Sequence, residues 1–224
     1  PAIRDLIAEG VNVNVTLLFS QAAYREVAAA WLTGLQVRHA RGLPLGSVAS
    51  VASFFVSRID TAVDALLEAK IKAAEGQVKT ELEGLRGKAA IANAKLAYQH
   101  YRELTAGRDW KSLVAASAQP QRLLWDSTSC KNPAYRDVIY VEELIGADTV
   151  NTLPPATLDA FVDHGIARAT ITEAADAAKR DLDLLSKHGI SLDAVTAKLL
   201  DDGVKQFEDA SDKLLGAVRT QAAG

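Results

Sequence analysis

GVNVNVTLLFS, residues 10–20, alternates apolar and polar side chains and then runs into Leu-Leu-Phe. Alternation with a period of two residues is typical of a β-strand, so we expect a strand at about residues 11–19. The preceding residues 1–9 place three apolar side chains at helical spacing, and Gly10 is the residue type that ends a helix in the left-handed conformation. The sequence therefore predicts a helix that leads directly into a strand with polar side chains near a buried element.

The same alternation of helix and strand recurs along the chain. Residues 21–42 carry the apolar face of an amphipathic helix, and the β-rich run SVASVASFFVSRID at residues 47–60 predicts a buried strand. From residue 61 to about 104 the composition changes to Ala, Leu, Lys and Glu, which indicates two or three long helices. Further strands are expected at Leu123–Thr128 and, very short, at Thr149–Thr152.

The last third of the chain is expected to be mainly helical. VIYVEELIG, residues 138–146, is a candidate short helix, and the Pro154-Pro155 pair precedes a helix that ends at Gly165. Residues 172–217 have a helical pattern with a break at residues 188–190.

Strands separated by helices imply parallel pairing with right-handed crossovers, which leaves a doubly wound sheet and a barrel as candidates. Polar residues fall within or at the C-terminal ends of the expected strands, where α/β folds place their ligands. Because only four strands accompany this much helix, we favour a (β/α)8 TIM barrel, with this chain supplying roughly the last four strands and extra helices. Residues 1–224 then form the C-terminal part of a single barrel domain, and the N-terminal strands are absent from the sequence.

Composition excludes several classes of protein. The 25 basic and 28 acidic residues give a net charge of −3 and are spread evenly, so no global field favours nucleic acid. The sequence has no apolar run long enough to cross a membrane, and its single cysteine excludes an internal disulfide, so we expect a cytoplasmic protein. Methionine is absent and the chain begins Pro-Ala-Ile-Arg, which indicates either a removed initiator or a start inside a longer polypeptide.

Two polar clusters follow successive buried strands. Arg58 comes just after Phe54-Phe55-Val56, where a guanidinium could clamp a phosphate, although a surface salt bridge explains it equally well. Residues 127–132, STSCKN, combine hydroxyls, a cation and loop amides, a set that an ordinary polar loop would also contain. Because parallel strands end at the same edge of a sheet, the two clusters together favour an anion site.

Four segments in this order resemble one family: VNVNVTLLFS, ASVASFFVSRID, STSCKNPAYRD and DTVNTLPPATLD. They resemble the second half of a transaldolase, in the long bacterial form that is sometimes fused to a glucose-6-phosphate isomerase. The resemblance extends over essentially all 224 residues. It implies transfer of a dihydroxyacetone unit between ketose and aldose phosphates in the pentose phosphate pathway.

The resemblance also implies a set of site residues. It places Asn14 and Thr16 beside the reactive centre as catalytic residues, with Thr16 helping to hold a catalytic water. The implied substrate-binding residues are Ser53, Phe55, Arg58, Ser129 and Lys131. Among them, Arg58 and Lys131 are the cations for the phosphate, and Phe55 stands where related fructose-6-phosphate aldolases carry tyrosine. Asp126 departs from the family's pattern, and we leave open whether it pairs with a cation, points outward between helices or changes the pocket.

The nucleophile that the family needs is not in this chain. Transaldolases form a Schiff base between a lysine and the ketose, and the resemblance places that lysine on a strand before residue 1. The lysines present lie among Glu and Ala in expected helices and are interpreted as solvated; they are Lys70, Lys72, Lys79, Lys88 and Lys95. The four histidines lack metal-ligand spacing, Cys130 is interpreted as a packed thiol, and we expect no metal and no cofactor.

We therefore expect a transaldolase of which this chain alone is inactive. The expected substrates are fructose 6-phosphate, sedoheptulose 7-phosphate, erythrose 4-phosphate and glyceraldehyde 3-phosphate, and the expected partner is the missing N-terminal half of the barrel, without nucleic acid or membrane. Two alternatives remain: a fructose-6-phosphate aldolase, which Phe55 disfavours, and a non-catalytic phosphosugar-binding fragment that lacks the nucleophile. An isomerase domain beyond Gly224 stays open.

Overall fold

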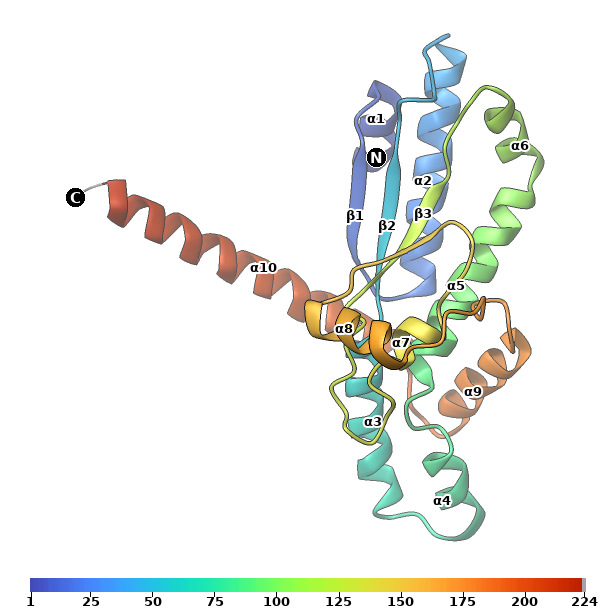
Figure 1. The fold of residues 1–224 in the computed structure, drawn as a ribbon, viewed down its shortest axis with the longest axis vertical. Coiled ribbons are helices and arrows are strands. Elements are labelled where there is room, and N and C mark those ends of the chain that lie inside the picture. Colours follow the sequence, from blue (N-terminus) through green and yellow to red (C-terminus); the bar gives the residue numbers. More distant parts are fainter. Residues whose placement is uncertain (223–224) are drawn as a thin grey trace.

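The structure is a computed structural model that describes residues 1–222, and it contains one parallel four-stranded sheet (Figure 1). The strands lie in the order in which they occur in the chain, and they are β1 Val13–Leu18, β2 Ser50–Phe55, β3 Gln121–Asp126 and β4 Thr149–Asn151. Among the described residues, β1 and β4 each pair on one side only. The expected α/β class with a parallel sheet is confirmed.

Helices separate and flank the strands. In chain order they are α1 Ala2–Glu9, α2 Gln21–Ala40, α3 Ser57–Ile71, α4 Gly76–Glu83, α5 Ala89–Ala106, α6 Arg108–Ala115, α7 Ile139–Glu142, α8 Pro155–His164, α9 Ala175–Lys187 and α10 Leu192–Ala222. Gly10 ends α1 with a φ of 89°, as expected. The helix-rich stretch after residue 61 resolves into α3, α4 and α5, and the expected break near residue 189 separates α9 from α10.

Two expected strand boundaries are wrong. The strand expected at Leu123–Thr128 is Gln121–Asp126. The strand predicted for residues 47–60 occupies only Ser50–Phe55, and α3 begins at Ser57. Val56 and Ser57 donate their backbone N–H groups to Asp126 and Ser127 across the strand end, and the chain then turns at once into the helix. The sequence does not mark this turn, because residues 57–60 follow the apolar run without a glycine or a proline.

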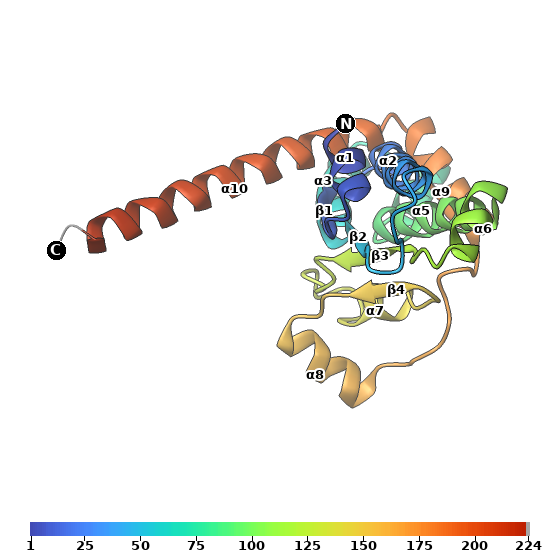
Figure 2. The ribbon, with the colours of Figure 1, turned by 90° about the horizontal axis from the view of Figure 1, so that it is seen from above.

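The two faces of the sheet have different surroundings. Alternate residues of β2 and β3, including Phe54, Leu123 and Trp125, are almost fully buried beneath α2 and α5 (Figure 2). Phe54 lies edge-on to both Tyr24 of α2 and Trp125 of β3. This packing of helices on one face leaves the intervening residues to form the opposite face, which is the more exposed of the two.

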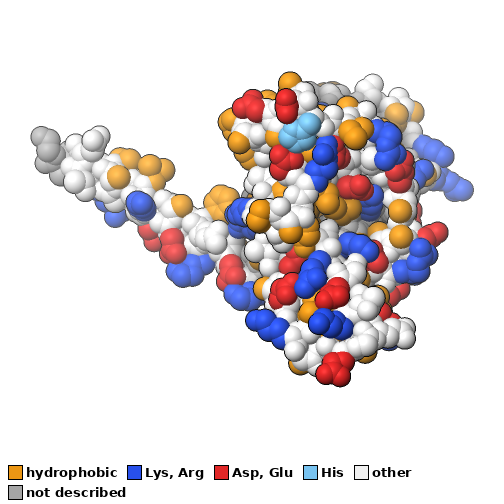
Figure 3. Space-filling model, turned by 60° about the horizontal axis from the view of Figure 1, so that its bottom comes forward, with side chains coloured by type: hydrophobic (Ala, Val, Ile, Leu, Met, Phe, Trp, Pro, Cys, Tyr) orange, Lys and Arg blue, Asp and Glu red, His pale blue; other side chains and the backbone are white. Residues whose placement is uncertain are grey.

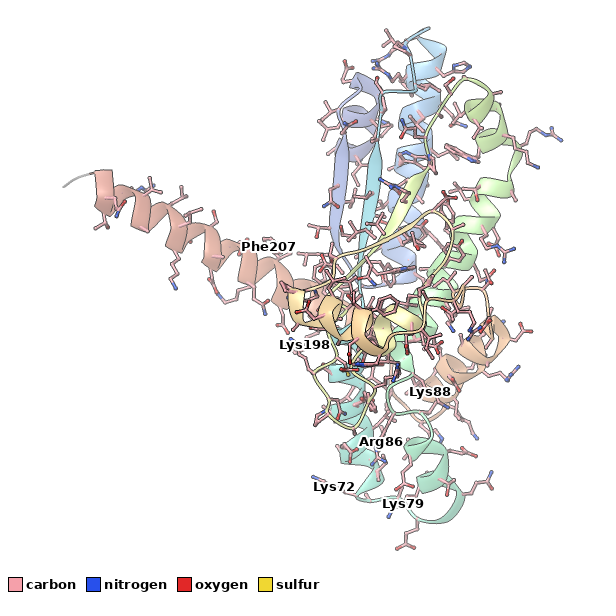
Figure 4. The ribbon with its side chains drawn as sticks, viewed as in Figure 1. Lys72, Lys79, Arg86, Lys88, Lys198 and Phe207 are labelled. Atoms are coloured by element: carbon pink, nitrogen blue, oxygen red, sulfur yellow. The ribbon has the colours of Figure 1, made fainter. Side chains whose placement is uncertain are left out.

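Helix α10 crosses the carboxyl end of the sheet and then leaves the body of the protein (Figure 1). It approaches β1 at Gly203, where a Cβ atom would lie 3.0 Å from the side chain of Leu17. Residues 204–221 are all exposed, including Phe207, whose position on the projecting part Figure 4 shows. No helix within residues 1–222 has the length and apolar character needed to cross a membrane.

Candidate active site

On the more exposed face of the sheet, two of the predicted site residues, Asn14 and Ser53, are in contact. Asn14 of β1 pairs in register with Val51, so it lies diagonally across from Ser53 on the same face of β2. The Ser53 hydroxyl is buried and donates a hydrogen bond of 2.7 Å to Oδ1 of Asn14. Because its carbonyl oxygen is held by Ser53, the Asn14 side chain presents its amide NH2 group away from β2.

Thr16 lies at a distortion of β1. The register with β2 shifts between Val15 and Leu18, and Leu17 adopts a φ of 60°, a conformation that a branched side chain rarely takes. Thr16 is exposed and directly precedes this bulge. Bulges redirect side chains at strand ends, so the distortion changes the direction in which β1 presents its last polar residue.

Phe55 and Arg58 form a second group at the end of β2. The Phe55 ring packs against Phe19 with ring centroids 5.1 Å apart, and the Arg58 guanidinium lies 5.3 Å from the centroid of Phe55. Arg58 therefore rests on the aromatic face, an arrangement that stabilises a cation and limits its movement. It belongs to the first turn of α3, rather than to the strand as the sequence pattern indicated.

Arg58 and Lys131 line one pocket of about 340 Å³ at the carboxyl end of the sheet. The remaining lining comes from α3 and α10 and consists of Thr61, Ala62, Leu199, Asp202 and Gln206. Nη1 of Arg58 donates to Oε1 of Gln206 at 3.2 Å. The two predicted cations thus meet, as expected for segments that follow neighbouring parallel strands.

The contribution of α10 to this pocket was not predictable from the sequence. Asp202 is bound by Lys198 one turn earlier, with Nζ 2.7 and 2.9 Å from its two carboxylate oxygens, which offsets part of its negative charge beside the cations. Both residues lie in an ordinary charged helix more than 65 residues after Lys131, and no local pattern distinguishes them. Only the crossing of α10 over the sheet brings Asp202 and Gln206 to Arg58.

The segment after β3, residues 127–137, forms a loop that we call the Lys131 loop. Asn132 organises its tip, since its side-chain oxygen accepts from the N–H of Ala134 and its carbonyl oxygen accepts from Tyr135. Ser129 is half-buried two residues before Lys131 and does not line the pocket shared by Arg58 and Lys131. Burial raises the pKa of the Cys130 thiol, which disfavours a reactive thiolate at neutral pH.

Asp126 lies on the more exposed face of the sheet. It pairs in register with Phe55, so the two side chains leave the sheet on the same side, opposite the helix-covered side of Trp125. Its carboxylate is half-exposed. This face excludes a position of the Asp126 side chain between α2 and α5, and the other two possibilities, a cation partner and a change to the pocket, stay open.

One lysine differs from its expected environment. Lys95 is 5% exposed and its Nζ lies 2.7 Å from Glu143, so interpreting it as solvated is wrong. The other four lysines considered are exposed, and Figure 4 shows Lys72 and Lys79 at the tip formed by α3 and α4, away from the sheet. Within residues 1–222, no cluster of three or more His, Cys, Asp or Glu side chains is arranged to hold a metal ion.

Comparison with known proteins gives one consistent result. Residues 1–218 match the family described as Transaldolase/Fructose-6-phosphate aldolase. The chain is 48% identical over 210 residues to a protein of Trichodesmium erythraeum named transaldolase, covering 92% of this chain and 55% of that protein. It is 47% identical to Transaldolase 1 of Streptomyces avermitilis over 225 residues, covering 100% of this chain and 58% of that protein. A transaldolase of Neisseria gonorrhoeae is 44% identical, with 96% and 57% covered. The chain therefore spans a little over half the length of these relatives.

Proposed function

The chain belongs to the transaldolase/fructose-6-phosphate aldolase family, and we propose that it forms part of a transaldolase that moves a dihydroxyacetone unit between sugar phosphates. The observation that carries this proposal is the shared pocket of Arg58 and Lys131, next to strands whose more exposed face carries Asn14 and Ser53. Two cations in one pocket suit a phosphate dianion, and hydroxyl and amide groups suit the polyol chain of a sugar.

Each predicted site residue then has a chemical task. Arg58 and Lys131 hold the substrate phosphate. Ser129, two residues before Lys131 in the same loop, stays a predicted phosphate ligand, although it does not line the pocket of the two cations. Ser53 fixes Asn14 so that its amide group faces the substrate, and Thr16 holds a water beside the reactive carbon. Phe55 supplies a wall that carries Arg58 on its face, as the distance of 5.3 Å supports.

The covalent step requires a lysine amine that attacks the ketose carbonyl and loses water to give a Schiff base. Cleavage of the adjacent carbon–carbon bond then releases an aldose phosphate and leaves an enamine, which attacks the acceptor aldehyde. Hydrolysis of the new Schiff base by one water releases the product ketose phosphate and frees the lysine amine. Of the candidate lysines, Lys95 is paired with Glu143, and the other four are exposed on helices or in the turns beside them, so we propose that the nucleophile belongs to strands outside residues 1–224.

Completion of a (β/α)8 barrel by those further strands is part of the proposal. The unpaired outer sides of β1 and β4 among the described residues support it, because open sheet edges favour pairing with another strand. The share of 55–58% that the chain covers in its relatives points the same way. The assignment of residues 1–224 to one barrel domain and the cytoplasmic location both stay predictions.

Borohydride trapping tests the proposal. The purified protein is incubated with fructose 6-phosphate, reduced with borohydride and analysed by intact mass and peptide mapping. The expected result is a covalent adduct only when a polypeptide carrying the remaining strands is present, located on that polypeptide. An adduct on a lysine within residues 1–224 would contradict our assignment of the nucleophile. Release of free dihydroxyacetone without transfer to erythrose 4-phosphate would identify the aldolase instead.

A further inference from the structure

Two carboxylates of α3 make the same pair of contacts one helical turn apart. Oδ1 of Asp64 accepts the backbone N–H of Gly87 at 3.1 Å, and its Oδ2 accepts the hydroxyl of Tyr135 at 2.7 Å. Asp60 repeats this pattern four residues earlier. Each carboxylate therefore joins the segment at the start of α5 to the segment that follows β3.

The contacts of Asp60 are the more buried of the two sets. Oδ1 of Asp60 accepts the N–H of Ala90 at 2.7 Å, and its Oδ2 accepts the hydroxyl of Tyr140 at 2.8 Å. The Asp60 side chain is 1% exposed and Tyr140 is 3% exposed. Hydrogen bonds to a buried carboxylate are stronger than those between neutral groups at a surface, so this contact anchors α7 firmly to α3.

The Lys131 loop is attached to α3 at both ends. Before Lys131, the N–H of Ser57 donates to the carbonyl of Ser127 at 3.0 Å, and the hydroxyls of Ser57 and Ser127 lie 3.2 Å apart. After Lys131, Tyr135 returns to Asp64 on the same helix. Arg58 lies in the first turn of that helix. Helix α3 therefore positions both cations of the shared pocket, Arg58 directly and Lys131 through its loop.

The surroundings of Tyr135 keep its hydrogen bond to Asp64 in place. Burial raises the pKa of the Tyr135 hydroxyl, which therefore remains a donor at neutral pH. Gly87 adopts a φ of 67°, and a Cβ atom there would lie 2.8 Å from Cζ of Tyr135. The ring thus rests directly on the backbone of the turn before α5, which fixes the direction of its hydroxyl.

From this arrangement we infer that Asp64 and Asp60 are positioning residues: through Tyr135 and Tyr140 they hold the Lys131 loop at the distance from Arg58 that a phosphate needs. The inference rests on the proposed phosphate site. Neither carboxylate lines the pocket of the two cations, so their effect passes through the loop. A loop ordered in advance loses less conformational entropy on binding, which is how such residues raise affinity.

Titration of the complete 224-residue chain with inorganic phosphate, followed by calorimetry, tests the inference. Tyr135→Phe removes one oxygen and keeps the ring, so the variant should fold while its phosphate affinity falls about tenfold, the effect of one well-placed hydrogen bond. Tyr101→Phe is the matched control, because the Tyr101 hydroxyl also donates to a carboxylate, that of Asp148 at 3.0 Å, away from the Lys131 loop. Its affinity should stay within about twofold of the parent.

The same substitution made in a Lys131→Ala chain distinguishes positioning of Lys131 from a general loss of structure. In a Lys131→Ala chain, Tyr135→Phe should cause no further loss of phosphate affinity, because the tyrosine acts through Lys131. Tyr140→Phe provides an independent second variant with the same expectation. Melting temperatures measured in parallel show whether each variant is folded.

The possible failures have different meanings. If Arg58→Ala and Lys131→Ala lower phosphate affinity but Tyr135→Phe behaves like Tyr101→Phe, the inference is overturned and the proposed phosphate site stands. If the same further loss appears with and without Lys131, the role of Tyr135 is only structural and the inference is again overturned. If neither Arg58→Ala nor Lys131→Ala changes the affinity, the proposed site and the inference fail together.

Discussion

The surroundings of Asp60 disfavour its charge. Burial raises its pKa from 3.8 to about 6, and the charge of Asp64 acts in the same direction, while the N–H groups of Ala90 and Ala89 and the Tyr140 hydroxyl oppose the shift. An acid with a higher pKa in the folded protein contributes stability below its unfolded pKa. That contribution is lost as the pH rises through the folded pKa.

This sign predicts a gain of stability on mild acidification. Between pH 7 and pH 4, the free energy of unfolding of the parent chain should rise relative to Asp60→Asn, by about 2 kcal/mol from the size of the shift. Urea unfolding of both chains across this range measures the difference, in which shared titrations cancel. A difference independent of pH would show that Asp60 has an ordinary pKa.

Asp137→Asn is the control of opposite sign at acid pH. A hydrogen bond from His164 lowers the pKa of the Asp137 carboxyl, and the same contact raises the pKa of His164. The contribution of the pair is therefore greatest while His164 is charged and Asp137 is ionised. Relative to Asp137→Asn, the parent chain should lose stability as the pH falls through the lowered pKa of Asp137, which is the direction opposite to that of Asp60.

The wrong prediction of a solvated Lys95 also has a physical cause at the scale of single residues. Sequence position identified a lysine in an Ala-rich helix, which usually indicates a solvated face. Helix α5 is instead packed by α2, α3 and α9, and its buried residues surround most of its circumference. Lys95 reaches Glu143 of a segment 48 positions away, and a partner at that distance leaves no local signal.

At the scale of elements, α1 and α2 approach each other closely at a glycine. A Cβ atom at Gly34 would lie 2.7 Å from the carbonyl oxygen of Arg4 and 2.8 Å from Cβ of Ile7. Alanine favours a helix over glycine by about 1 kcal/mol, but here the added methyl group would push α1 away. Gly34→Ala should therefore lower the melting temperature.

Gly216→Ala provides the comparison within α10, because nothing lies within 4 Å of the new Cβ position. This substitution should increase the helical circular-dichroism signal at 222 nm and leave the melting temperature unchanged or higher. If both alanines lowered the melting temperature equally, the close approach of α1 and α2 would not be the reason.

The strands and helices themselves were largely predictable from sequence. Three of the signals are local in the sequence: the alternation in β1, the β-branched and aromatic run of β2, and the glycine after α1. Such short-range patterns are enough to indicate these elements. The start of α3 was not predictable, because the backbone bonds from Val56 and Ser57 to the end of β3 decide it. Arg58 was consequently identified as a phosphate ligand while being assigned to the wrong element.

At the scale of the whole molecule, α10 is the outlying element. Figure 3 shows apolar side chains along the projecting helix and a mixture of both charges over the body in that view. The exposed apolar side chains include Leu200, Val204, Phe207, Leu214 and Val218, which follow one another at intervals of three, four or seven residues. In proteins most of the stability of a helix comes from tertiary packing, which the exposed residues 204–221 of α10 lack, so this outer part should open more readily than the packed elements.

Limited proteolysis with trypsin checks this expectation. Cleavage should begin at Lys205, Lys213 and Arg219, all exposed on α10, and should precede cleavage at the buried Lys95. Mass spectrometry of short digests identifies the order. Equal protection of Lys213 and Lys95 would contradict a solvent-exposed α10 and indicate that another surface covers it.

Asp60 and Asp64 each hydrogen-bond both the chain at the start of α5 and the segment after β3, and these contacts also make the turn before α5 sensitive to anion binding in the pocket. Coupling between binding and local opening is reciprocal, so an anion held by Arg58 and Lys131 must stabilise the contacts that keep those cations in place. The amide hydrogens of Gly87 and Ala90, which the two carboxylates accept, should exchange with solvent more slowly when phosphate is bound. The amide of Ala49, bound by the Asn12 side chain at the opposite end of the sheet, should keep its rate. Two backbone hydrogens that touch no substrate would then report whether the pocket is occupied.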